Sequence, residues 1–596
     1  MICLVHALSW RSDDAVVDVD LDLREPSSHL VRVELRLQPR LPQLRLQLPA
    51  WTPGSYLIRD YVRNLEGLEV VQGSRVLTAQ RLGPACWQVE VDPAASPLTI
   101  RYRILATDLT VRTCHLDHEH GFLALAAVVL EVEGERWSPH RLRCLLPEGW
   151  RAFSSLPGSL DVAEGVIARD LDQLLDAPLE CGPHAERAFS VAGVPHRWVT
   201  WAGASSGDGS DDWLLQTFPT LLSDVEQVCL ACCRLMGVPR PASEGYLFIL
   251  HLVDDGYGGL EHDDGTVLIY GRRNLAKADG YRKFLQLVAH EYLHQWNVRR
   301  LRPAELTPID YHRPVAVPTL WFAEGITSYV DQFLPLTAGL STAEQLLEDL
   351  GAELSRYRLT PGRFVQSLRQ SSQEAWVKLY RADAYSGDSQ ISYYLKGAVV
   401  ALCLDLHLRR SGSCLAVVLQ TLWQRFGRYG RGYQEADVLT AFSDAAADLG
   451  TLLPNWLESV DDPDLDGYLR DVGLLLEPVE AETPWIGLTA AVDAGQLIAR
   501  RVQRGGPAET AGLMVGDELL ALDGLRLRDP EQLSAALRPG AEQQLLMARR
   551  SQIRSLTLSS LPPRPDSYKL IEDPEADAQA LQRREQWLSL LGGASW

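Results

Sequence analysis

The sequence predicts a multidomain protein of the α+β class, and three observations carry that prediction. Short runs up to about residue 150 alternate apolar and polar residues with a period of two, which indicates antiparallel strands with one solvent-facing side. Residues 340–460 favour several amphipathic helices, and a compact β-rich unit follows from about residue 480. A chain of 596 residues is also too long for one hydrophobic core, so several domains are expected.

Composition limits the classes of partner and the compartment. The formal charge of −21 argues against nucleic acid or an anionic membrane surface as the main partner. No apolar run is long enough to span a membrane, and the first ten residues lack the features of a secretory signal. The ten cysteines are scattered, so we expect reduced thiols and a cytoplasmic protein. Nothing in the sequence indicates an oligomeric state.

An N-terminal β-sandwich-like domain is expected over residues 1–165. Its clearest strands are Leu30–Leu37 and Leu98–Ile104, and an ordered loop rich in aromatic residues is expected at 49–61. The run Cys114–His120 contains several possible metal ligands, but it lacks the paired spacing of a structural zinc site. We therefore interpret these residues as structural polar groups.

The middle of the chain, residues 166–475, is expected to form one domain with a helical lobe. A loop is predicted at 205–212, then a helix over 213–236 that Pro219 interrupts. The three cysteines of this helix are interpreted as packing residues; they are Cys229, Cys232 and Cys233. Buried strands are predicted at Tyr246–Val253 and Thr266–Tyr270. An edge strand between them would offer an extended peptide a backbone to pair with.

The segment His290-Glu291-Tyr292-Leu293-His294 points to metal chemistry. The window from Tyr281 to Trp296 lacks Pro and Gly, which predicts a helix, and His290 and His294 then project from one face. Two such imidazoles can share a zinc ion at about 2.0–2.1 Å each. Glu291 lies beside the metal, where a carboxylate can accept a proton from the water that zinc activates. The spacing therefore predicts a zinc hydrolase.

A third protein ligand is expected downstream of this helix. The candidates are Glu305, Asp310, His312 and Glu324. Glu324 is the best placed, because it lies in a predicted helix within an aromatic run, which suits a buried and oriented carboxylate.

Several motifs together resemble the glycyl aminopeptidase family of gluzincin zinc metallopeptidases with a C-terminal PDZ domain. They are W-T-P-G-S-Y-L-I-R-D-Y, G-G-L-E-H at 258–262, H-E-Y-L-H, H-Q-W-N-V-R-R-L-R-P, W-F-A-E-G-I-T-S-Y and S-Y-Y-L-K-G at 392–397. The resemblance implies a thermolysin-like catalytic domain. Glu324 follows His294 after 29 intervening residues, which is longer than in the aminopeptidase N and leukotriene hydrolase branch.

The resemblance also implies roles for residues outside the zinc motif. Gly258, Gly259 and Glu261 are similar to the strand that binds substrate in the wider superfamily, where the Glu binds the free α-amine. His262 replaces the Asn of that pattern. Tyr394 matches the Tyr that donates a hydrogen bond to the oxyanion, with Tyr393 as the neighbouring alternative.

The C-terminal part divides into a unit over 480–561 and a tail over 562–596. The unit resembles a PDZ domain of the bacterial protease type, with Gly487-Leu488 at the position of the carboxylate-binding loop. Its groove either binds a peptide or chain end, or is occluded in a docking module. The tail is charged and rich in proline, and Glu575–Leu591 favours one helix.

The expected function is that of an aminopeptidase with one Zn²⁺ ion, which removes N-terminal residues from peptides with a free N-terminus. The family implies small first residues, Gly or Ala. One alternative is an endopeptidase that captures substrates through its PDZ unit, and another is a non-catalytic peptide-binding scaffold. Neither a nucleic acid nor a membrane is expected as a partner.

Overall fold

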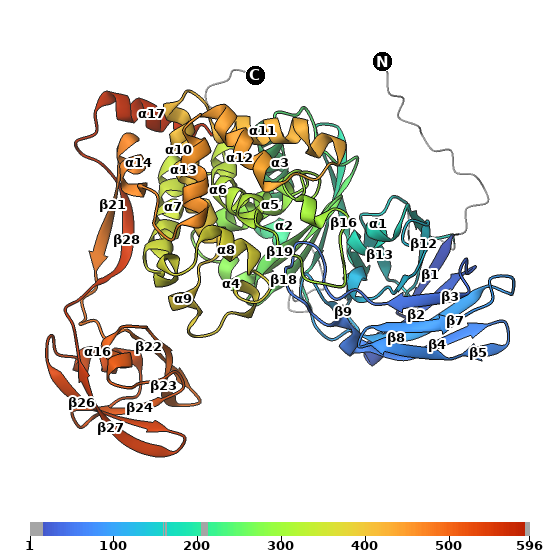
Figure 1. Cartoon of the computed structure of the whole chain (residues 1–596), viewed down its shortest axis with the longest axis horizontal. Helices are drawn as coiled ribbons and strands as arrows, with labels where there is room; N and C mark the ends of the chain where they lie inside the picture. Colours follow the sequence, from blue (N-terminus) through green and yellow to red (C-terminus); the bar gives the residue numbers. More distant parts are fainter. Residues whose placement is uncertain (1–15, 159, 161–163, 204–212, 591–596) are drawn as a thin grey trace. The chain divides into compact units, whose positions relative to one another are not determined.

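The computed structural model describes residues 16–158, 160, 164–203 and 213–590 (Figure 1). The expectations for the first ten residues and for the loop at 205–212 lie outside the described residues. The chain forms two compact units: Met1–Val315 with Trp423–Gly432, and Ala316–Leu422 with Tyr433–Trp596.

The first unit begins with three β-sheets, as the alternating sequence predicts. In the described residues the largest of these has seven strands in the order β14-β12-β1-β2-β8-β4-β5. Strand β2 alternates buried apolar and exposed charged residues along its length, because one face covers the core. The bounds are β14 (Val166–Ala168), β12 (His140–Leu145), β1 (Val17–Asp22), β2 (Leu30–Leu37), β8 (Leu98–Leu105), β4 (Leu65–Gln72) and β5 (Arg75–Leu77).

Two smaller sheets complete this region. One has the order β13-β15-β10-β9 and the other β11-β3-β7-β6. The bounds are β13 (Arg151–Ser154), β15 (Leu179–Gly182), β10 (Gly121–Leu123), β9 (Cys114–Leu116), β11 (Glu131–Val132), β3 (Gln43–Gln47), β7 (Cys86–Glu90) and β6 (Ala79–Gly83). The short helix α1 (Leu171–Asp176) precedes β15.

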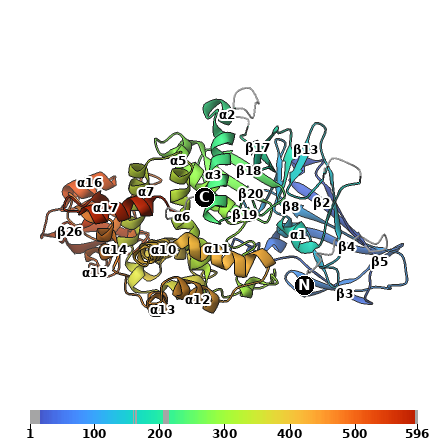
Figure 2. The same ribbon diagram turned by 90° about the horizontal axis from the view of Figure 1, so that it is seen from above.

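The sheet that carries the predicted site residues is mixed, with the order β16-β17-β18-β20-β19. Strands β17, β18 and β20 run parallel, and β19 pairs antiparallel at the edge, as predicted for the peptide-docking strand. Helices α3 and α5 pack together and against this sheet (Figure 2). The bounds are β16 (Glu186–Val191), β17 (Val194–Trp201), β18 (Tyr246–Val253), β20 (Gly265–Gly271), β19 (Tyr257–His262), α2 (Trp213–Thr217), α3 (Leu221–Leu235), α4 (Arg272–Leu275) and α5 (Gly280–Leu293).

A helical lobe opens the second unit. The π-helical turn η5 (Trp321–Gly325) leads into α6 (Ile326–Thr337), and α10 (Tyr393–Arg410) is buried on nearly every side. A helix that is apolar all round belongs in the interior of a bundle. The other helices up to residue 471 are α7 (Ala343–Arg358), α8 (Leu368–Gln373), α9 (Ser386–Ser389), α11 (Leu415–Arg425), α12 (Glu435–Ala445), α13 (Leu449–Glu458) and α14 (Leu465–Asp471).

The C-terminal β unit forms a separate sheet with its own core, in the order β22-β23-β24-β26-β27. The bounds are β22 (Leu488–Asp493), β23 (Gln496–Val502), α15 (Pro507–Thr510), β24 (Glu518–Leu522), β25 (Leu525–Arg526), α16 (Pro530–Ala536), β26 (Glu542–Arg549) and β27 (Gln552–Ser559). The predicted fold class, including a C-terminal PDZ domain, is confirmed.

The tail returns to the helical lobe, which the sequence does not predict. Strand β28 (Pro565–Glu572) pairs with β21 (Leu474–Glu480), and α17 (Ala578–Leu588) lies within the predicted helix. The indole N–H of buried Trp587 donates to the Tyr329 hydroxyl at 2.8 Å. The predicted domain limits and the cytoplasmic location stay predictions. None of the described helices is long and apolar enough to cross a membrane.

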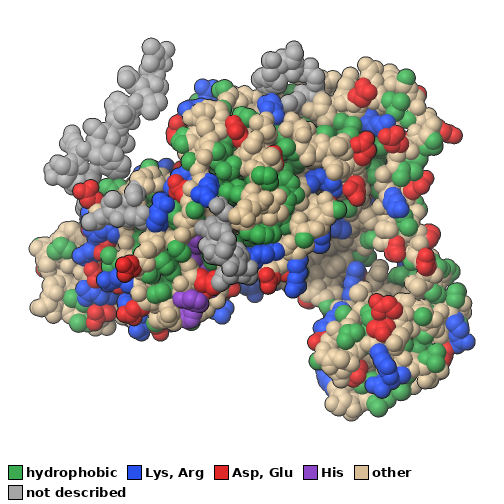
Figure 3. Space-filling model, turned by 180° about the vertical axis from the view of Figure 1, so that it is seen from behind, with side chains coloured by type: hydrophobic (Ala, Val, Ile, Leu, Met, Phe, Trp, Pro, Cys, Tyr) green, Lys and Arg blue, Asp and Glu red, His purple; other side chains and the backbone are tan. Residues whose placement is uncertain are grey.

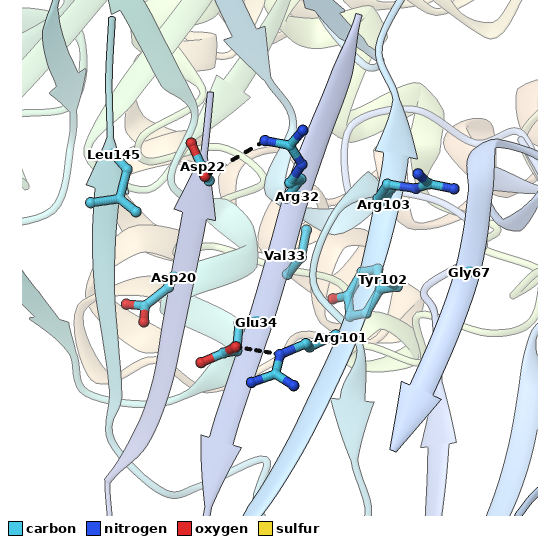
Figure 4. Close-up of a pocket in the computed structure, with 10 residues that line it drawn as sticks. All are labelled: Asp20, Asp22, Arg32, Val33, Glu34, Gly67, Arg101, Tyr102, Arg103 and Leu145. Carbon is cyan, nitrogen blue, oxygen red and sulfur yellow. Dashed lines mark hydrogen bonds and ion pairs between the residues drawn. The ribbon is translucent and has the colours of Figure 1, made fainter. Parts of the chain in front are cut away.

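A hollow of about 430 Å³ lies over the charged face of the largest sheet (Figure 4). Its acids and bases pair with one another, for example Glu34 with Arg101 at 2.6 Å and Asp22 with Arg32 at 3.9 Å. Charges of both signs are interspersed over this region, at the left of Figure 3. No predicted site residue lines this hollow.

Candidate active site

Helix α5 is held on its sheet by a hydrogen bond inside the zinc motif. His196 on β17 donates from Nδ1 to the Val194 carbonyl at 2.9 Å, so its Nε2 accepts from the Tyr292 hydroxyl at 2.9 Å. Burial lowers the pKa of His196 to about 4, which keeps the imidazole neutral in this role. The bond sets the rotation of α5 and therefore the direction of its other side chains.

The two histidines of the motif suit a metal. Helix α5 ends at Leu293, and His294 follows as a helical cap residue, so both imidazoles lie on one side with ring centroids 4.6 Å apart. His294 Nδ1 lies 2.8 Å from the Asn297 carbonyl, which only accepts, so Nδ1 carries the proton. Its Nε2 is then the unprotonated ring nitrogen, which is the form that can bind a metal. A backbone carbonyl that fixes the tautomer is the usual partner of a metal-ligating histidine.

Gly259 makes room for the predicted base. A Cβ atom at Gly259 on β19 would lie 2.2 Å from Glu291 Oε1 and 2.4 Å from Glu291 Cγ. Atoms cannot approach so closely, so only glycine lets α5 pack here against β19. The predicted substrate strand and the predicted base are therefore in direct contact.

Glu261 is a buried acid at the end of the same strand. It is 4% exposed, and its Oε1 has no hydrogen-bond partner among the described residues. A buried carboxylate oxygen without a partner is costly, so a cationic ligand is its natural complement. Glu261 is also the residue to which the family resemblance assigns the binding of the substrate's free α-amine.

The N-terminal loop closes the site on the far side of Glu261. Gly54 has a positive φ of 84°, and a Cβ atom there would lie 2.4 Å from Glu261 Oε2. The space left beside Glu261 is a cavity of about 10 Å³, lined also by Trp51, Pro53 and Tyr56. That is room for about one water molecule. The loop at 49–61 therefore forms part of the site.

Glu261, Glu291 and His294 form one cluster. Each offers an oxygen or nitrogen atom that lies within 4.8 Å of those from the other two. All three are buried. A carboxylate oxygen of the predicted amine-binding acid therefore lies within 4.8 Å of one of the predicted base.

Asp176, at the end of α1, fixes the residues around Glu261. Its carboxylate accepts from Arg299 Nη2 at 2.6 Å and from the Asp263 amide at 2.7 Å, and it lies 3.3 Å from His262 Nδ1. Burial alone would lower the pKa of Arg299, but the charges of Asp176 and Asp263 raise it above its usual value. His262, which replaces the expected Asn, thus binds the scaffold through Nδ1.

The edge of β19 is also occupied by the N-terminal region. Arg112 donates to the Gly259 carbonyl at 3.0 Å. This carbonyl is one of the groups that an added substrate strand would use. The sequence alone does not show that Arg112 contacts β19, because the two are far apart in the chain.

In the second unit, Glu324 lies on the π-helical turn η5 and is buried. Single turns of π-helix occur often at functional sites. The turn packs on α10 through a contact between two glycines, because a Cβ atom at Gly325 would lie 2.5 Å from the Gly397 Cα atom. Both glycines belong to the motifs W-F-A-E-G and Y-L-K-G, so these motifs meet in the fold.

Tyr394 lies on the first turn of α10. Its hydroxyl is 3.2 Å from that of Tyr380, and Ser392 accepts from the Tyr394 amide at 3.2 Å. Burial and the charge of Glu324 raise the pKa of Tyr394 well above its usual value, so the phenol stays protonated and able to donate. Tyr393 is fully buried, whereas Tyr394 is half-buried, which favours Tyr394 as the tyrosine that meets a substrate.

The other candidate third ligands have different environments. His312 pairs with Glu131 of the N-terminal region at 2.8 Å, and Asp310 accepts from the His312 amide at 2.9 Å. Glu305 is half-buried on a short 3₁₀ turn. His312 and Asp310 therefore make hydrogen bonds that stabilise the surrounding fold.

Gly487 and Leu488 stand at the start of β22, which is the edge strand of its sheet. The Gly487 carbonyl accepts from the Gln503 amide at 2.8 Å. Buried Asp388 on α9 binds Arg501 at 2.8 Å and the Arg504 amide at 2.9 Å. The C-terminal β unit is thus anchored to the helical lobe close to this loop.

Comparison with protein families agrees with these features. The model of the M61 glycyl aminopeptidase matches residues 283–400, that of the peptidase M61 N-terminal domain matches residues 18–183, and a PDZ domain matches residues 498–550. Comparison with curated proteins finds no match.

Among solved structures, this chain is similar to an aminopeptidase N family protein from Idiomarina loihiensis. The two share 27% identity and a TM-score of 0.87, over 96% of this chain and 100% of the other. Legionella pneumophila aminopeptidase A is 13% identical, with a TM-score of 0.47 over 94% of this chain and 58% of the other. Yeast LTA4 hydrolase is 14% identical, with a TM-score of 0.45 over 77% and 71%.

The fold and the site together define a metallopeptidase related to the aminopeptidases. More particularly, the chain belongs to the M61 glycyl aminopeptidase family, with the N-terminal domain of that family and a PDZ domain.

The contact between Gly54 and Glu261 leads to a first prediction. We expect Gly54→Ala to lower kcat/KM for a glycyl chromogenic amide by about 10- to 100-fold, because the added methyl displaces the carboxylate. Gly149→Ala is the matched control, since Gly149 has a similar φ of 81° and no atom within 4 Å of its added Cβ. Equal kcat/KM values for the two variants would contradict a role for Gly54.

The environment of Lys396 leads to a second prediction. Burial lowers the pKa of Lys396 to about 8, and its ammonium donates to the Arg363 carbonyl at 3.1 Å. The folded chain therefore releases this proton above about pH 8, while the unfolded chain keeps it until about pH 10.4. Stability from this group thus rises with pH across that window.

Lys396→Met removes this dependence. We expect the thermal midpoint of the wild type, measured relative to the variant by scanning calorimetry, to be higher at pH 9.5 than at pH 7. Lys378→Met is the control, because Lys378 is a partly exposed lysine of the same lobe that pairs with Glu374 at 2.6 Å. Its thermal midpoint should differ from that of the wild type by the same amount at both pH values. A difference for Lys396→Met that is independent of pH would refute the assignment.

Proposed function

We propose that the chain is a zinc-dependent aminopeptidase that removes small N-terminal residues, Gly or Ala, from peptides. One observation carries the proposal. Glu261 and Glu291 lie with His294 in one cluster of atoms within 4.8 Å. An ammonium bound by Glu261 leaves room for only the first peptide bond beside Glu291.

Three side chains are proposed as ligands of a single zinc ion: His290, His294 and Glu324. Two neutral imidazoles and a carboxylate match the donor set of catalytic zinc, which leaves a fourth position for water or substrate. The tautomer of His294 supports the assignment, because Nδ1 is committed to the Asn297 carbonyl. When bound, zinc polarises the scissile carbonyl and makes water nucleophilic near neutral pH.

The proton transfers are assigned to Glu291. Its carboxylate accepts the proton of the attacking water and passes it to the leaving amine. General acid–base catalysis of this kind contributes roughly 10²–10⁴ in rate. The contact with Gly259 supports the role, because it holds the carboxylate against the strand that binds substrate.

Tyr394 is proposed to donate a hydrogen bond to the oxyanion that develops on the substrate carbonyl. Its pKa, raised well above the usual value, supports this role because the phenol keeps its proton. A donor of this kind is worth about 2.7–4 kcal/mol of transition-state stabilisation.

Glu261 is proposed to bind the substrate ammonium, with Gly258 and Gly259 forming the strand beside the first residue. The small cavity next to Glu261 supports a preference for short first side chains. The contact of Arg112 with the Gly259 carbonyl argues against long extended substrates on that side, and so against the endopeptidase alternative.

The C-terminal unit is proposed to bind a peptide or chain end by strand addition at β22, with the Gly487-Leu488 turn holding the carboxylate. The position of β22 at the sheet edge supports this role.

The zinc assignment predicts different outcomes for two carboxylates. We expect Glu324→Ala to lose the catalytic zinc together with activity, whereas Glu291→Gln keeps the zinc and loses at least about 10²-fold in kcat. Plasma mass spectrometry of the purified proteins measures the metal, and Glu305→Gln serves as the control. Turnover by Glu291→Gln at the wild-type rate would refute the proton-transfer role of Glu291. A wild type without zinc and without turnover would leave only the scaffold alternative.

The amine assignment predicts a dependence on the free N-terminus. We expect the wild type to cleave Gly-Gly peptides with a free amine and to spare the acetylated forms. Glu261→Gln should lower kcat/KM for the free peptides by about 10²-fold or more, since the pairing of charges is lost. Equal cleavage of both peptide forms would favour the endopeptidase.

A further inference from the structure

A second set of possible metal ligands lies in the first unit, away from helix α5. Glu180 on β15 is fully buried and meets three imidazoles. His120 Nδ1 and His184 Nε2 lie 2.9 and 2.8 Å from its Oε1, and His251 Nε2 lies 2.8 Å from its Oε2. The proposed functions of the active site use none of these side chains.

The four residues come from three separate segments of the chain. His120 immediately precedes β10, Glu180 lies within β15, His184 follows that strand, and His251 lies on β18 of the mixed sheet. The ring of His184 folds back over Gly182, where an added Cβ atom would lie 2.4 Å from His184 Nε2. Glycine at 182 thus provides the space that brings the fourth side chain into the cluster.

Among the described residues, no lysine or arginine pairs with the carboxylate of Glu180. The ion-pair partners of Glu180 among the described residues are imidazoles. A buried carboxylate without a cation is costly, and a divalent ion would supply the missing charge.

We propose that Glu180, His120, His184 and His251 bind a second Zn²⁺ ion in a closed, structural site. Four protein ligands from imidazole and carboxylate groups complete tetrahedral zinc without a position for water. One potential ligand atom each from His120, Glu180 and His251 already lies within 4.8 Å of the others. Zinc bonds of about 2.0–2.1 Å require ligand atoms roughly 3.3 Å apart, so small side-chain movements are enough.

The ion would fasten two sheets together. His120 and Glu180 belong to the sheet of β10 and β15, and His251 belongs to the sheet that carries β19. The stacking of His120 on Trp201, with ring centroids 4.1 Å apart, already joins the two sheets at this point. The site would therefore stabilise the contact that places the N-terminal loop against Glu261.

Metal counting on the full chain tests the proposal. We expect plasma mass spectrometry to find two zinc ions per wild-type chain. Glu180→Gln, which is nearly isosteric, should retain one, and His290→Ala should also retain one, lost from the other site. Glu135→Gln is the matched control, because Glu135 is another buried acid of the N-terminal region. Its zinc content should remain two.

Anomalous diffraction of wild-type crystals at the zinc edge tests the location without any variant. We expect one peak between Glu180 and the three imidazoles and another at His290 and His294. A single zinc per wild-type chain, lost entirely in His290→Ala, would overturn the proposal and leave a cluster held by hydrogen bonds alone. A second peak located elsewhere would overturn it as well.

Discussion

The close approach of helix α5 to strand β19 at Gly259 is the constraint on which the active site depends. A side chain at this position would meet Glu291 at about two ångströms, so the helix and the strand could not pack as they do. Because the two elements touch, Glu291 on the helix and Glu261 on the strand lie within one small cluster. The bond between Tyr292 and His196 then fixes the rotation of the helix. In the proposed mechanism, this packing requirement limits which peptide bond Glu291 can reach.

The N-terminal β region is part of this site rather than an appendage. Gly54 lies against the carboxylate of Glu261, Arg112 binds the edge of β19, and Asp176 ties the end of that strand to Arg299. These contacts close one end of the site. An exopeptidase needs such a closed end, because an open groove would admit a chain on both sides of the scissile bond.

Sequence periodicity predicts the elements of this fold well. The alternation at Leu30–Leu37 and the apolar run at Tyr246–Val253 coincide with β2 and β18. The helix predicted over Tyr281–Trp296 is also confirmed, although it ends at Leu293. Local motifs indicate the pair His290 and His294 because both lie on one helical face.

The sequence does not show which segments far apart in the chain pair with one another. Strand β28 is polar and rich in turn-forming neighbours, and only its pairing with β21 makes it a strand. Arg112 and Asp176 carry no local signal, since their partners lie more than a hundred residues away in most cases. Gly54 lies in the motif W-T-P-G-S-Y, but the sequence does not show that this motif meets Glu261. The cluster around Glu180 shows the same limit. His120 alone resembles a surface polar residue, and its meaning depends on three side chains from other segments.

The two proposed zinc sites differ in a way that separates catalysis from structure. His290 is half-buried, and its site has three protein ligands, which leaves a coordination position for chemistry. The cluster of Glu180 is fully enclosed and offers four ligands, which satisfies the ion and excludes water. The same metal would therefore be reactive in one place and inert in the other. The two proposed sites differ in the number of side chains that the fold brings to each. The enclosed site would also stabilise the contact between the two sheets that close one end of the active site.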